Sequence, residues 1–384
     1  MKKLLAGIIC VAMSATMLVG CGNKAANTGT SAVQEETSAP VQEEASSGGE
    51  STENKAYHFE IVSKGFQSTY WQAVYKGASA KAAELGVTIN MVGPNSESDI
   101  ADQVQMLNSA VNAAPDAIGL AALDTNASLD AIKAAQDAGI PIIGFDSGVP
   151  NAPEGAVYAN ASTDNYKAGT VAAEGMYEGI KDRILNATGQ VRIGEVNQDA
   201  TSESICNRGL GFIDQMISLI TADGKTVAVV GNDYYVSNIK GNVVDEKSAD
   251  VVIEVRVPSQ TTTELTAIEA ATILNKKDTI AIFGSNQVAA EGIVTANGNL
   301  NVLGTSDDKI IGVGFDSGSV LKAAIKDGTL YGAVTQAPVA IGEKMVELLV
   351  KVANGESVSD VDTGCQWYNA ENIDSPEIAQ NLYD

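Results

Sequence analysis

The amino-acid sequence predicts an α/β protein in which short apolar strands alternate with longer helices. From Tyr57 onward, apolar runs are separated by loops and by stretches of helical composition. Two runs, AIGLAAL at 117–123 and IPIIGF at 140–145, are apolar on both faces, as parallel strands covered by helices should be. About 330 residues are more than one ordinary core contains, so two domains are expected.

The expected strands form two series, and helices are expected between them because the intervening stretches are long enough for several turns. The first series of strands lies at 58–63, 87–92, 116–121, 140–145 and 156–160. The second series lies at 190–196, 226–230, 251–257, 279–283, 310–315 and 331–335. The expected helices lie at 70–85, 99–113, 127–138, 164–182, 203–220, 263–275, 286–296, 317–327 and 338–353. Residues 231–250 look like an insertion whose role the sequence does not indicate.

The N-terminal segment indicates export from the cytoplasm. Lys2 and Lys3 precede an apolar run, which is the pattern of a secretory signal and is too short to span a membrane. The run ends at Cys21 and resembles a bacterial lipobox, in which the cysteine is lipidated and becomes the new N-terminus. The alternative is an ordinary cleavage site beside a chance cysteine. We expect a signal peptide at 1–20 and a lipid-anchored, extracytoplasmic protein.

A flexible tether is expected at 21–56. Residues 22–55 contain no aromatic side chain and consist mostly of small and polar residues, so they cannot bury enough apolar surface to offset their conformational entropy. A lipid anchor followed by such a tether would hold a folded domain near a membrane without embedding it.

Charge and histidine content exclude several classes of function. The net charge of −24 is unfavourable for nucleic-acid binding, which depends on lysine and arginine. His58 is the only histidine, which excludes most catalytic triads and metal sites, so we expect no enzyme, no metal and no cofactor. Cys206 and Cys365 remain after Cys10 and Cys21 are assigned to the leader, and they are either a disulfide or two free thiols.

Two distant strands end in the same motif. PIIGFDSGVP at 141–150 and KIIGVGFDSGSV at 309–320 both stop at Gly-Phe-Asp-Ser-Gly. Ligands of open parallel sheets bind outside the carboxyl ends of the strands, so Asp146 and Asp316 are predicted to face one cleft. A carboxylate accepts two hydroxyl donors at once, which suits a sugar. The alternative is that each aspartate caps the following helix, and Asp316 directly precedes the helix expected at 317–327.

Several further motifs, in their order and spacing, resemble the periplasmic-binding-protein-like sugar receptors of ABC transporters. They are KGFQSTYWQAVYKGA (64–78), AGIPIIGFDS (138–147), STDNYKAG (162–169), NRGLGF (207–212), IFGSNQ (282–287), IGVGFDSG (311–318) and AVTQAPVAIG (333–342). The resemblance implies two Rossmann-like lobes with parallel sheets, joined by a hinge of three crossings near Ser162–Asn165, Gln336–Ala337 and Asp362–Gly364. It implies lobe one at 57–161 plus 337–362, and lobe two at 162–336 plus 363–384.

The resemblance also implies polar ligand-binding residues. Arg208 would donate to ring or hydroxyl oxygens, unless it is a solvated surface charge. Asn286 and Gln336 follow strands, and their amides can donate or accept, unless they bond to loop backbone. Ser147 accompanies Asp146, and Gln260 and Thr261 stand where many relatives carry an aromatic residue.

The first strand–helix loop would complete the site with Lys64, Ser68, Tyr70 and Trp71. An aromatic face packs on the C–H face of a sugar, although Trp71 also fits core packing. Relatives that bind pentoses often carry a small polar residue where Lys64 stands. A lysine at this position resembles the receptors for autoinducer-2. Those receptors, however, would not be expected to carry an arginine at the position of Arg208.

The implied function is a monomeric receptor that binds a monosaccharide and closes by hinge bending. It would deliver the sugar to an ABC permease and its ATPase subunit for import. Alternatives are an autoinducer-2 or nucleoside-type ligand, or a sensor subunit that presents sugar to a histidine kinase or chemoreceptor. The sequence contains no G-x-S-x-G motif, the nucleophile elbow that would indicate a hydrolase.

Overall fold

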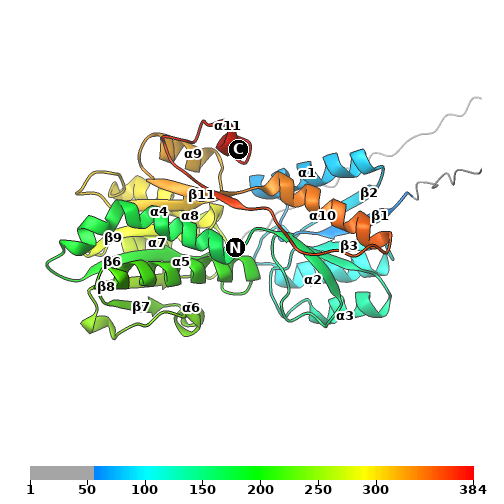
Figure 1. Cartoon of the computed structure of the whole chain (residues 1–384), viewed down its shortest axis with the longest axis horizontal. Coiled ribbons are helices and arrows are strands. Elements are labelled where there is room, and N and C mark those ends of the chain that lie inside the picture. Colours follow the sequence, from blue (N-terminus) through cyan, green and yellow to red (C-terminus); the bar gives the residue numbers. More distant parts are fainter. Residues whose placement is uncertain (1–55) are drawn as a thin grey trace, which may run out of the picture. The chain divides into compact units, whose positions relative to one another are not determined.

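The computed structural model describes residues 56–384, which form two α/β lobes, each built on its own sheet (Figure 1). The predicted fold class is therefore confirmed. The predicted signal peptide, almost all of the predicted tether and the proposed lipid site at Cys21 lie outside the described residues. Within the described residues, none of the helices is both long and apolar enough to cross a membrane.

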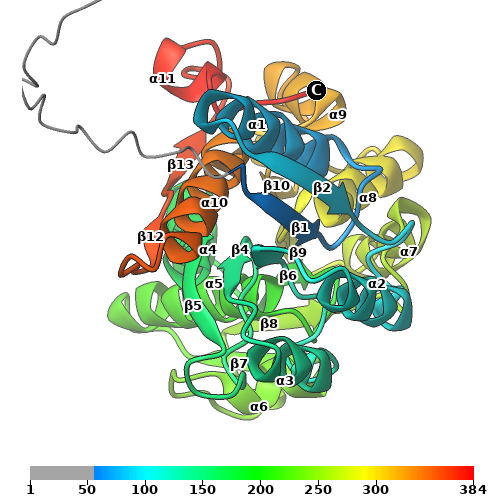
Figure 2. The ribbon, with the colours of Figure 1, turned by 90° about the vertical axis from the view of Figure 1, so that its right-hand side faces the viewer.

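Lobe one contains a six-stranded, wholly parallel sheet with helices on both faces (Figure 2). In spatial order its strands are β12 (Val361–Asp362), β5 (Val157–Ser162), β4 (Ile142–Phe145), β3 (Ala117–Leu120), β1 (His58–Val62) and β2 (Thr88–Val92). One face packs against α1 (Thr69–Leu85) and α10 (Pro338–Ala353). The other packs against α2 (Ile100–Asn112) and α3 (Leu129–Asp137).

Lobe two contains a seven-stranded sheet that is parallel except for one strand. In spatial order its strands are β13 (Cys365–Tyr368), β11 (Gly332–Gln336), β10 (Ile311–Phe315), β9 (Thr279–Gly284), β6 (Val191–Val196), β8 (Val251–Arg256) and β7 (Val227–Gly231). Helices α4 (Asn165–Leu185) and α5 (Glu203–Ala222) cover one face; α7 (Thr263–Leu274), α8 (Gln287–Leu300) and α9 (Ser319–Lys326) cover the other. The antiparallel β13 and the two-residue β12 were not predicted, because both are short and adjoin a polar loop.

The chain passes between the sheets at three places. These are the links from β5 to α4, from β11 to α10 and from β12 to β13. We propose that they mark the predicted domain boundaries, with 57–161 plus 337–362 in lobe one and 162–336 plus 363–384 in lobe two. A short helix near the C-terminus, α11 (Pro376–Ala379), follows β13.

The segment at 231–250 lies along the edge of the lobe-two sheet. It contains α6 (Asp233–Asn238) and a 3₁₀ helix at Glu246–Ser248. The backbone N–H of Val244 donates to the carbonyl oxygen of Val227 on the edge strand β7 at 2.9 Å. An uncovered edge strand offers unpaired backbone groups to other chains. The segment therefore occupies part of an edge that would otherwise be open.

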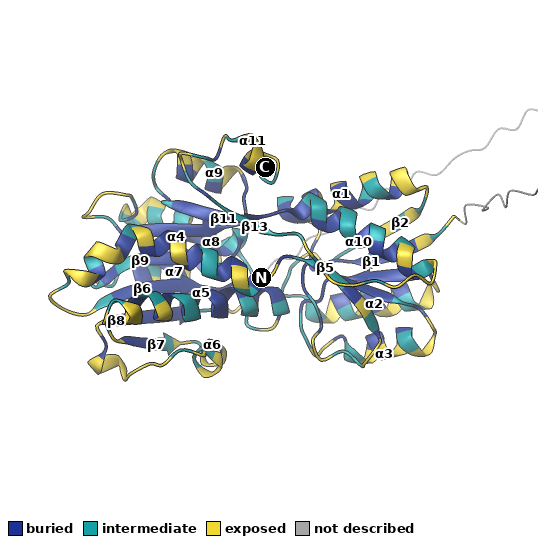
Figure 3. Cartoon of the chain, viewed as in Figure 1, coloured by how far each residue is buried: buried dark blue, intermediate teal, exposed yellow. Residues whose placement is uncertain are grey.

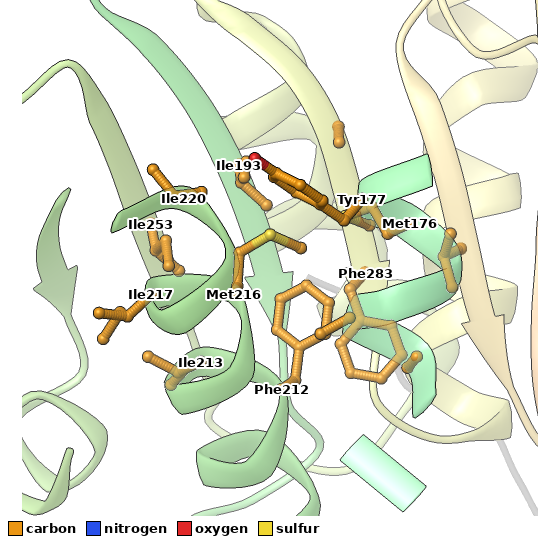
Figure 4. Close-up of a cluster of buried hydrophobic side chains, with 14 of the residues drawn as sticks. Met176, Tyr177, Ile193, Phe212, Ile213, Met216, Ile217, Ile220, Ile253 and Phe283 are labelled. Carbon is orange, nitrogen blue, oxygen red and sulfur yellow. The ribbon is translucent and has the colours of Figure 1, made fainter. Parts of the chain in front are cut away.

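Both sheets are buried between their helical layers, while the outer faces of the helices are exposed (Figure 3). A large cluster of apolar side chains lies between the lobe-two sheet and α4 and α5 (Figure 4). Phe212 of α5 stacks on Phe283 of β9, with the ring centroids 4.4 Å apart. Burial of each such side chain contributes roughly 1.5–3 kcal/mol. These cores fix the strands and hence the positions of the residues at their carboxyl ends.

The helix pair on one face of each sheet is packed closely enough to require glycine. In lobe one, a Cβ atom at Gly77 of α1 would lie 2.0 Å from the carbonyl oxygen of Val339 on α10. In lobe two, a Cβ atom at Gly211 of α5 would lie 2.0 Å from the carbonyl oxygen of Tyr166 on α4. Any larger residue at either position would push the paired helices apart.

Candidate functional site

A cavity between the lobes gathers residues from the carboxyl ends of strands in both sheets. Nine of the twelve predicted ligand-binding residues line it, namely Lys64, Ser68, Tyr70, Trp71, Asp146, Arg208, Asn286, Asp316 and Gln336. Its other lining residues, which sequence reasoning missed, are Glu97, Gln198, Ser204, Ile205, Gln287 and Val288. The described residues contain no group of three or more His, Cys, Asp or Glu side chains suited to a metal ion.

The two aspartates of the repeated motif have the same local geometry. Asp146 follows β4 and Asp316 follows β10, and both adopt the left-handed region, with φ of 57° and 71°. The N–H of Asp146 donates to the carbonyl oxygen of Ala161, and that of Asp316 donates to the carbonyl oxygen of Val334, on the neighbouring strand in each case. Aspartate tolerates this backbone region better than most residues. The repeated sequence therefore produces a repeated turn that directs a carboxylate into the cavity from each lobe.

Asp146 is held by two lobe-one side chains. Tyr70 donates its hydroxyl to Asp146, and the Lys64 ammonium lies 3.2 Å from the other carboxylate oxygen. Lys64 also donates to the hydroxyl of Ser204 in lobe two at 3.0 Å. Burial lowers the pKa of Lys64, but the carboxylates of Asp146, Glu97 and others outweigh it, so this pKa is raised. The lysine therefore stays charged inside the protein.

Asp316 is held by lobe-two groups. It accepts from the amide of Gln336 at 2.7 Å and from the backbone N–H of Gln287 at 3.1 Å, and a guanidinium nitrogen of Arg208 lies 3.9 Å away. Burial raises the pKa of Asp316, although Arg208 opposes this. The N-cap of α9 is Gly318, so the alternative that Asp316 caps the following helix is wrong.

Arg208 is fully buried, which contradicts its alternative interpretation as a surface charge. Its terminal nitrogens donate to the carbonyl oxygen of Ser285 at 2.8 Å and to the side chain of Asn165 at 2.7 Å. The guanidinium also stacks on the ring of Phe315, 3.7 Å from the centroid. These contacts fix the plane of the guanidinium and leave its Nε as a free donor among the described residues.

Two predicted ligand residues also cap helices. The hydroxyl of Ser68 accepts from the N–H of Trp71 at the start of α1, at 3.4 Å. The side-chain oxygen of Asn286 accepts from the N–H of Ala289 at the start of α8, at 3.0 Å. The backbone role foreseen as the alternative for Asn286 is therefore present, and its amide nitrogen donates to Gln198.

The aromatic residues differ in how they contribute to the cavity. Trp71 is only 1% exposed; its ring packs edge-on against Phe145, and its indole N–H donates to Glu97 at 2.8 Å. Tyr70 presents its hydroxyl to Asp146 and packs edge-on against Tyr383 near the C-terminus. Core packing, the alternative named for Trp71, thus describes most of its surface.

Tyr383 connects the C-terminus to the site. Its carbonyl oxygen accepts from the N–H of Gly318 at 3.1 Å and from the hydroxyl of Ser317 at 3.1 Å. These bonds anchor it to the turn that carries Asp316, while its ring packs against apolar residues of lobe one. It is a contact between lobes at the last residue but one of the chain, and no sequence pattern pointed to it.

Three predicted ligand residues do not line the cavity. The hydroxyl of Ser147 is directed to the backbone N–H of Ser204, 3.2 Å away, so it joins the lobes. The N–H of Thr261 donates to the hydroxyl of Ser98 in lobe one at 2.7 Å, and Gln260 is exposed to solvent. The loop after β8 therefore contacts lobe one through Thr261 instead of lining the cavity.

Among the residues that were missed, only Gln198 had a usable signal. It follows β6 by two positions, as Lys64 follows β1 by two positions. Glu97 is one of two acidic residues in the polar loop after β2, and no pattern distinguishes it from the other. Cys206 and Cys365 are free thiols, which is one of the two alternatives left by the sequence, and burial raises the pKa of Cys206 to about 12.

The cavity is small, and some polar atoms of its walls have no hydrogen-bond partner among the described residues. Its volume is about 40 Å³, far below the roughly 300 Å³ at which ligand pockets begin. Gln336 presents an acceptor oxygen without a hydrogen bond, and Arg208 presents its Nε donor, while one oxygen of Asp146 has only the ion pair with Lys64. Buried polar groups usually have partners. A ligand that supplies both donors and acceptors would satisfy these atoms, provided that the lining side chains move to enlarge the cavity.

Comparison with known proteins identifies a family. Residues 59–357 match the family described as the periplasmic binding protein domain. The ribose import binding protein of Bacillus subtilis (strain 168) is 23% identical over 289 residues, which are 75% of this chain and 79% of that protein.

Two solved structures combine higher identity with nearly full coverage. One, from Brachyspira murdochii, is described as an ABC transporter, LacI family transcriptional regulator. It is 35% identical with a TM-score of 0.71, and the match covers 86% of this chain and 100% of that one. An ABC transporter solute-binding protein from Agrobacterium vitis, with bound D-fucose, is 30% identical with a TM-score of 0.69, and the match covers 85% of this chain and 100% of that one.

Proposed function

The chain belongs to the periplasmic binding protein domain family, and from this premise we propose that it binds a monosaccharide or related polyol between its lobes. One observation carries the proposal: two carboxylates, a guanidinium and an amide from both lobes converge on one buried cavity, where an acceptor of Gln336 and a donor of Arg208 have no partner. Each sugar hydroxyl donates and accepts, so vicinal hydroxyls complement this mixed set. The ribose import binding protein and the D-fucose complex among its relatives support the same class of ligand.

The binding step would include closure of the lobes. Contacts such as Lys64 to Ser204 and Ser147 to Ser204 join the lobes around the cavity. A ligand gripped by both Asp146 and Asp316 has a higher affinity for the closed form and shifts the population toward it by that difference. A sugar that lacks one hydroxyl would leave a buried group unpaired, which provides selectivity among epimers.

A thermal-shift panel of pentoses, hexoses, inositol, nucleosides and autoinducer-2 tests the ligand class. We expect at least one monosaccharide to raise the melting temperature, and isothermal titration to give a Kd for it. Autoinducer-2 belongs in the panel because Lys64 lines the cavity. Asp316→Asn serves as the site variant and should weaken the Kd at least 10-fold, about 1.4 kcal/mol. If no polyol stabilises the protein, the proposal is wrong.

We further propose that the receptor is a monomeric lipoprotein, anchored through Cys21, that delivers its ligand to an ABC permease and its ATPase subunit. The import role named for the Bacillus subtilis relative supports this. Uptake of the labelled sugar by cells that lack the protein should be restored by the wild-type gene. Cys21→Ala should release the protein from the membrane. If cells that lack the protein take up the sugar normally but lose a transcriptional or chemotactic response to it, the sensor alternative is favoured.

A further inference from the structure

A hydrogen-bonded pair that sequence reasoning missed spans the cavity. Glu97 belongs to lobe one and Gln198 to lobe two, and both line the cavity. The amide nitrogen of Gln198 donates to one carboxylate oxygen of Glu97 at 2.9 Å. The other carboxylate oxygen accepts from the indole N–H of Trp71 at 2.8 Å, and the side-chain oxygen of Gln198 accepts from the side-chain amide of Asn286. Four side chains thus form a continuous chain of hydrogen bonds from one lobe to the other.

The surroundings hold Glu97 in this position. The next residue, Ser98, accepts from the N–H of Thr261 in lobe two at 2.7 Å, so two neighbouring residues of one loop bridge the lobes. A Cβ atom at Gly65 would lie 3.3 Å from Cγ of Glu97 and 3.4 Å from Cδ1 of Trp71. The glycine therefore permits the carboxylate and the indole to approach each other.

The charges in the cavity make Glu97 the carboxylate in excess. Lys64 lies against Asp146 at 3.2 Å, and Arg208 lies nearest to Asp316 at 3.9 Å. Glu97 is instead bonded to two neutral donors, Trp71 and Gln198. The pKa of Glu97 is raised above its ordinary value because the group is buried, although the Lys64 charge and the two hydrogen bonds oppose this shift. An anionic group on a ligand would face three acids and two cations that are already engaged.

We propose that Glu97 and Gln198 are specificity-determining residues that form an interlobe clasp and let the cleft close around a neutral sugar but not around the corresponding sugar acid. The inference rests on the proposed sugar-binding function and adds the charge of the ligand to it. A carboxylate on the ligand near Glu97 would place like charges together in a buried cavity, where water screens the repulsion poorly. Opening the clasp to relieve this repulsion would lose the Gln198 contact.

The first experiment removes the charge of Glu97 while keeping the size of its side chain and one of its two acceptor oxygens. Wild type, Glu97→Gln and Glu203→Gln are titrated at pH 7.5 with D-ribose and D-ribonate, and with D-galactose and D-galacturonate. Glu203 is a matched control because it is also an acidic interlobe contact, to the N–H of Gly148 at 3.3 Å, but does not line the cavity. We expect Glu97→Gln to improve the acid-to-neutral affinity ratio at least 10-fold, and Glu203→Gln to leave it within about 2-fold.

The second experiment tests the clasp itself through a double-mutant cycle. Glu97→Ala and Gln198→Ala should each weaken binding of the neutral sugar about 10-fold, mainly by faster dissociation. The double variant should be no weaker than the poorer single variant, because both remove the same contact. Each variant is first checked by circular dichroism and thermal unfolding.

The outcomes separate the two proposals. If wild type binds a neutral sugar but Glu97→Gln leaves the acid-to-neutral ratio unchanged, or if the two alanine effects simply add, the clasp inference is overturned and sugar binding stands. If wild type binds the sugar acid as tightly as the neutral sugar, the inference is likewise overturned. If wild type binds no sugar at all, the proposed function falls and the clasp inference falls with it.

Discussion

Strand β1 of lobe one and strand β6 of lobe two occupy equivalent positions in their sheets but carry different side chains. β1 lies between β2 and β3, and β6 lies between β8 and β9. The last residues of the two strands, Val62 and Val196, each accept a backbone N–H from just beyond the neighbouring strand. One residue before them, lobe one has Ile61 and lobe two has Glu195, both fully buried. The same backbone position therefore accepts an apolar side chain in one sheet and a carboxyl group in the other.

The comparison extends to the residues two positions beyond these strands. Lys64 of lobe one reaches Ser204 of lobe two, and Gln198 of lobe two reaches Glu97 of lobe one. Each lobe thus sends one long polar side chain to the other. The partners of the aspartates differ, however: Lys64 both pairs with Asp146 and crosses between lobes, whereas Arg208 is fixed within lobe two. We infer that opening disturbs the lobe-one aspartate more than the lobe-two aspartate.

The largest expected difference between the lobes concerns removal of their aspartates. Asp146→Ala leaves the buried Lys64 without its nearest carboxylate, so we expect a loss of about 3–5 kcal/mol in the free energy of unfolding. Asp316→Ala leaves Arg208 with the carbonyl oxygen of Ser285 and the side chain of Asn165, so a loss of about 1–3 kcal/mol is expected. Urea unfolding monitored by circular dichroism measures both.

A second variant checks the cause of that difference. Lys64→Met in the Asp146→Ala background removes the uncompensated charge and should recover most of the lost stability, since replacing a buried pair by apolar groups is often close to neutral. Equal losses for the two aspartate variants, or no recovery with Lys64→Met, would show that the two lobes do not differ in this respect.

The pH dependence of stability should reveal the buried carboxyl group of Glu195, which occupies the position in lobe two that Ile61 occupies in lobe one. Burial raises the pKa of Glu195 well above its ordinary value of 4.5, although a hydrogen bond from Asn197 opposes this. The folded protein holds this proton more tightly than the unfolded chain does. The contribution of Glu195 to stability is therefore greatest below pH 4.5 and falls as the pH rises toward the raised pKa. The slope reaches at most about 1.4 kcal/mol per pH unit.

Glu195→Gln keeps an acceptor for Asn197 but removes the titrating group. We expect its melting temperature to exceed that of wild type above pH 7, with the two curves converging toward pH 4. Parallel curves over this range would mean that Glu195 does not titrate as its burial requires. Ile61→Val in lobe one is a control that should shift stability by the same amount at every pH.

The smallest expected effect belongs to the C-terminal contact. Tyr383→Ala removes a ring that joins the turn of Asp316 to Tyr70 of lobe one, but it leaves the cavity lining intact. We expect ligand dissociation to accelerate about 3-fold to 10-fold, with a change below about 1.4 kcal/mol. Tyr383→Phe should behave like wild type because the ring contact remains. Stopped-flow release kinetics distinguish the variants, and an unchanged rate for Tyr383→Ala would exclude a closing role.

Regular features of the sequence predicted most of the fold. Apolar runs and helical stretches located the strands and helices, because both elements are long enough to leave a clear period. The repeated motif placed Asp146 and Asp316 at strand ends, where parallel sheets bind ligands, and both line the cavity. The two-residue β12 and the antiparallel β13 escaped because pairing across a distant link leaves no local pattern.

The remaining site residues depend on tertiary geometry that the sequence does not encode locally. Glu97 acquires its role only when its loop meets Gln198 of the other lobe. Thr261 was expected to bind ligand but instead contacts Ser98, a residue of the other lobe that lies far away in the sequence. Tyr383 lies far along the chain from Tyr70, and only the docked C-terminus brings the rings together.

The close contact of α1 with α10 has a consequence for how the chain acquires its structure. The two helices meet backbone to backbone at Gly77 and Val339, yet all of lobe two up to β11 lies between them in the sequence. An emerging chain has the strands β6 to β11 before α10 exists, so that stretch can collapse while the sheet of lobe one still exposes an apolar face. The first lobe to begin synthesis is therefore the last to be completed, and chaperones would be needed most during that interval.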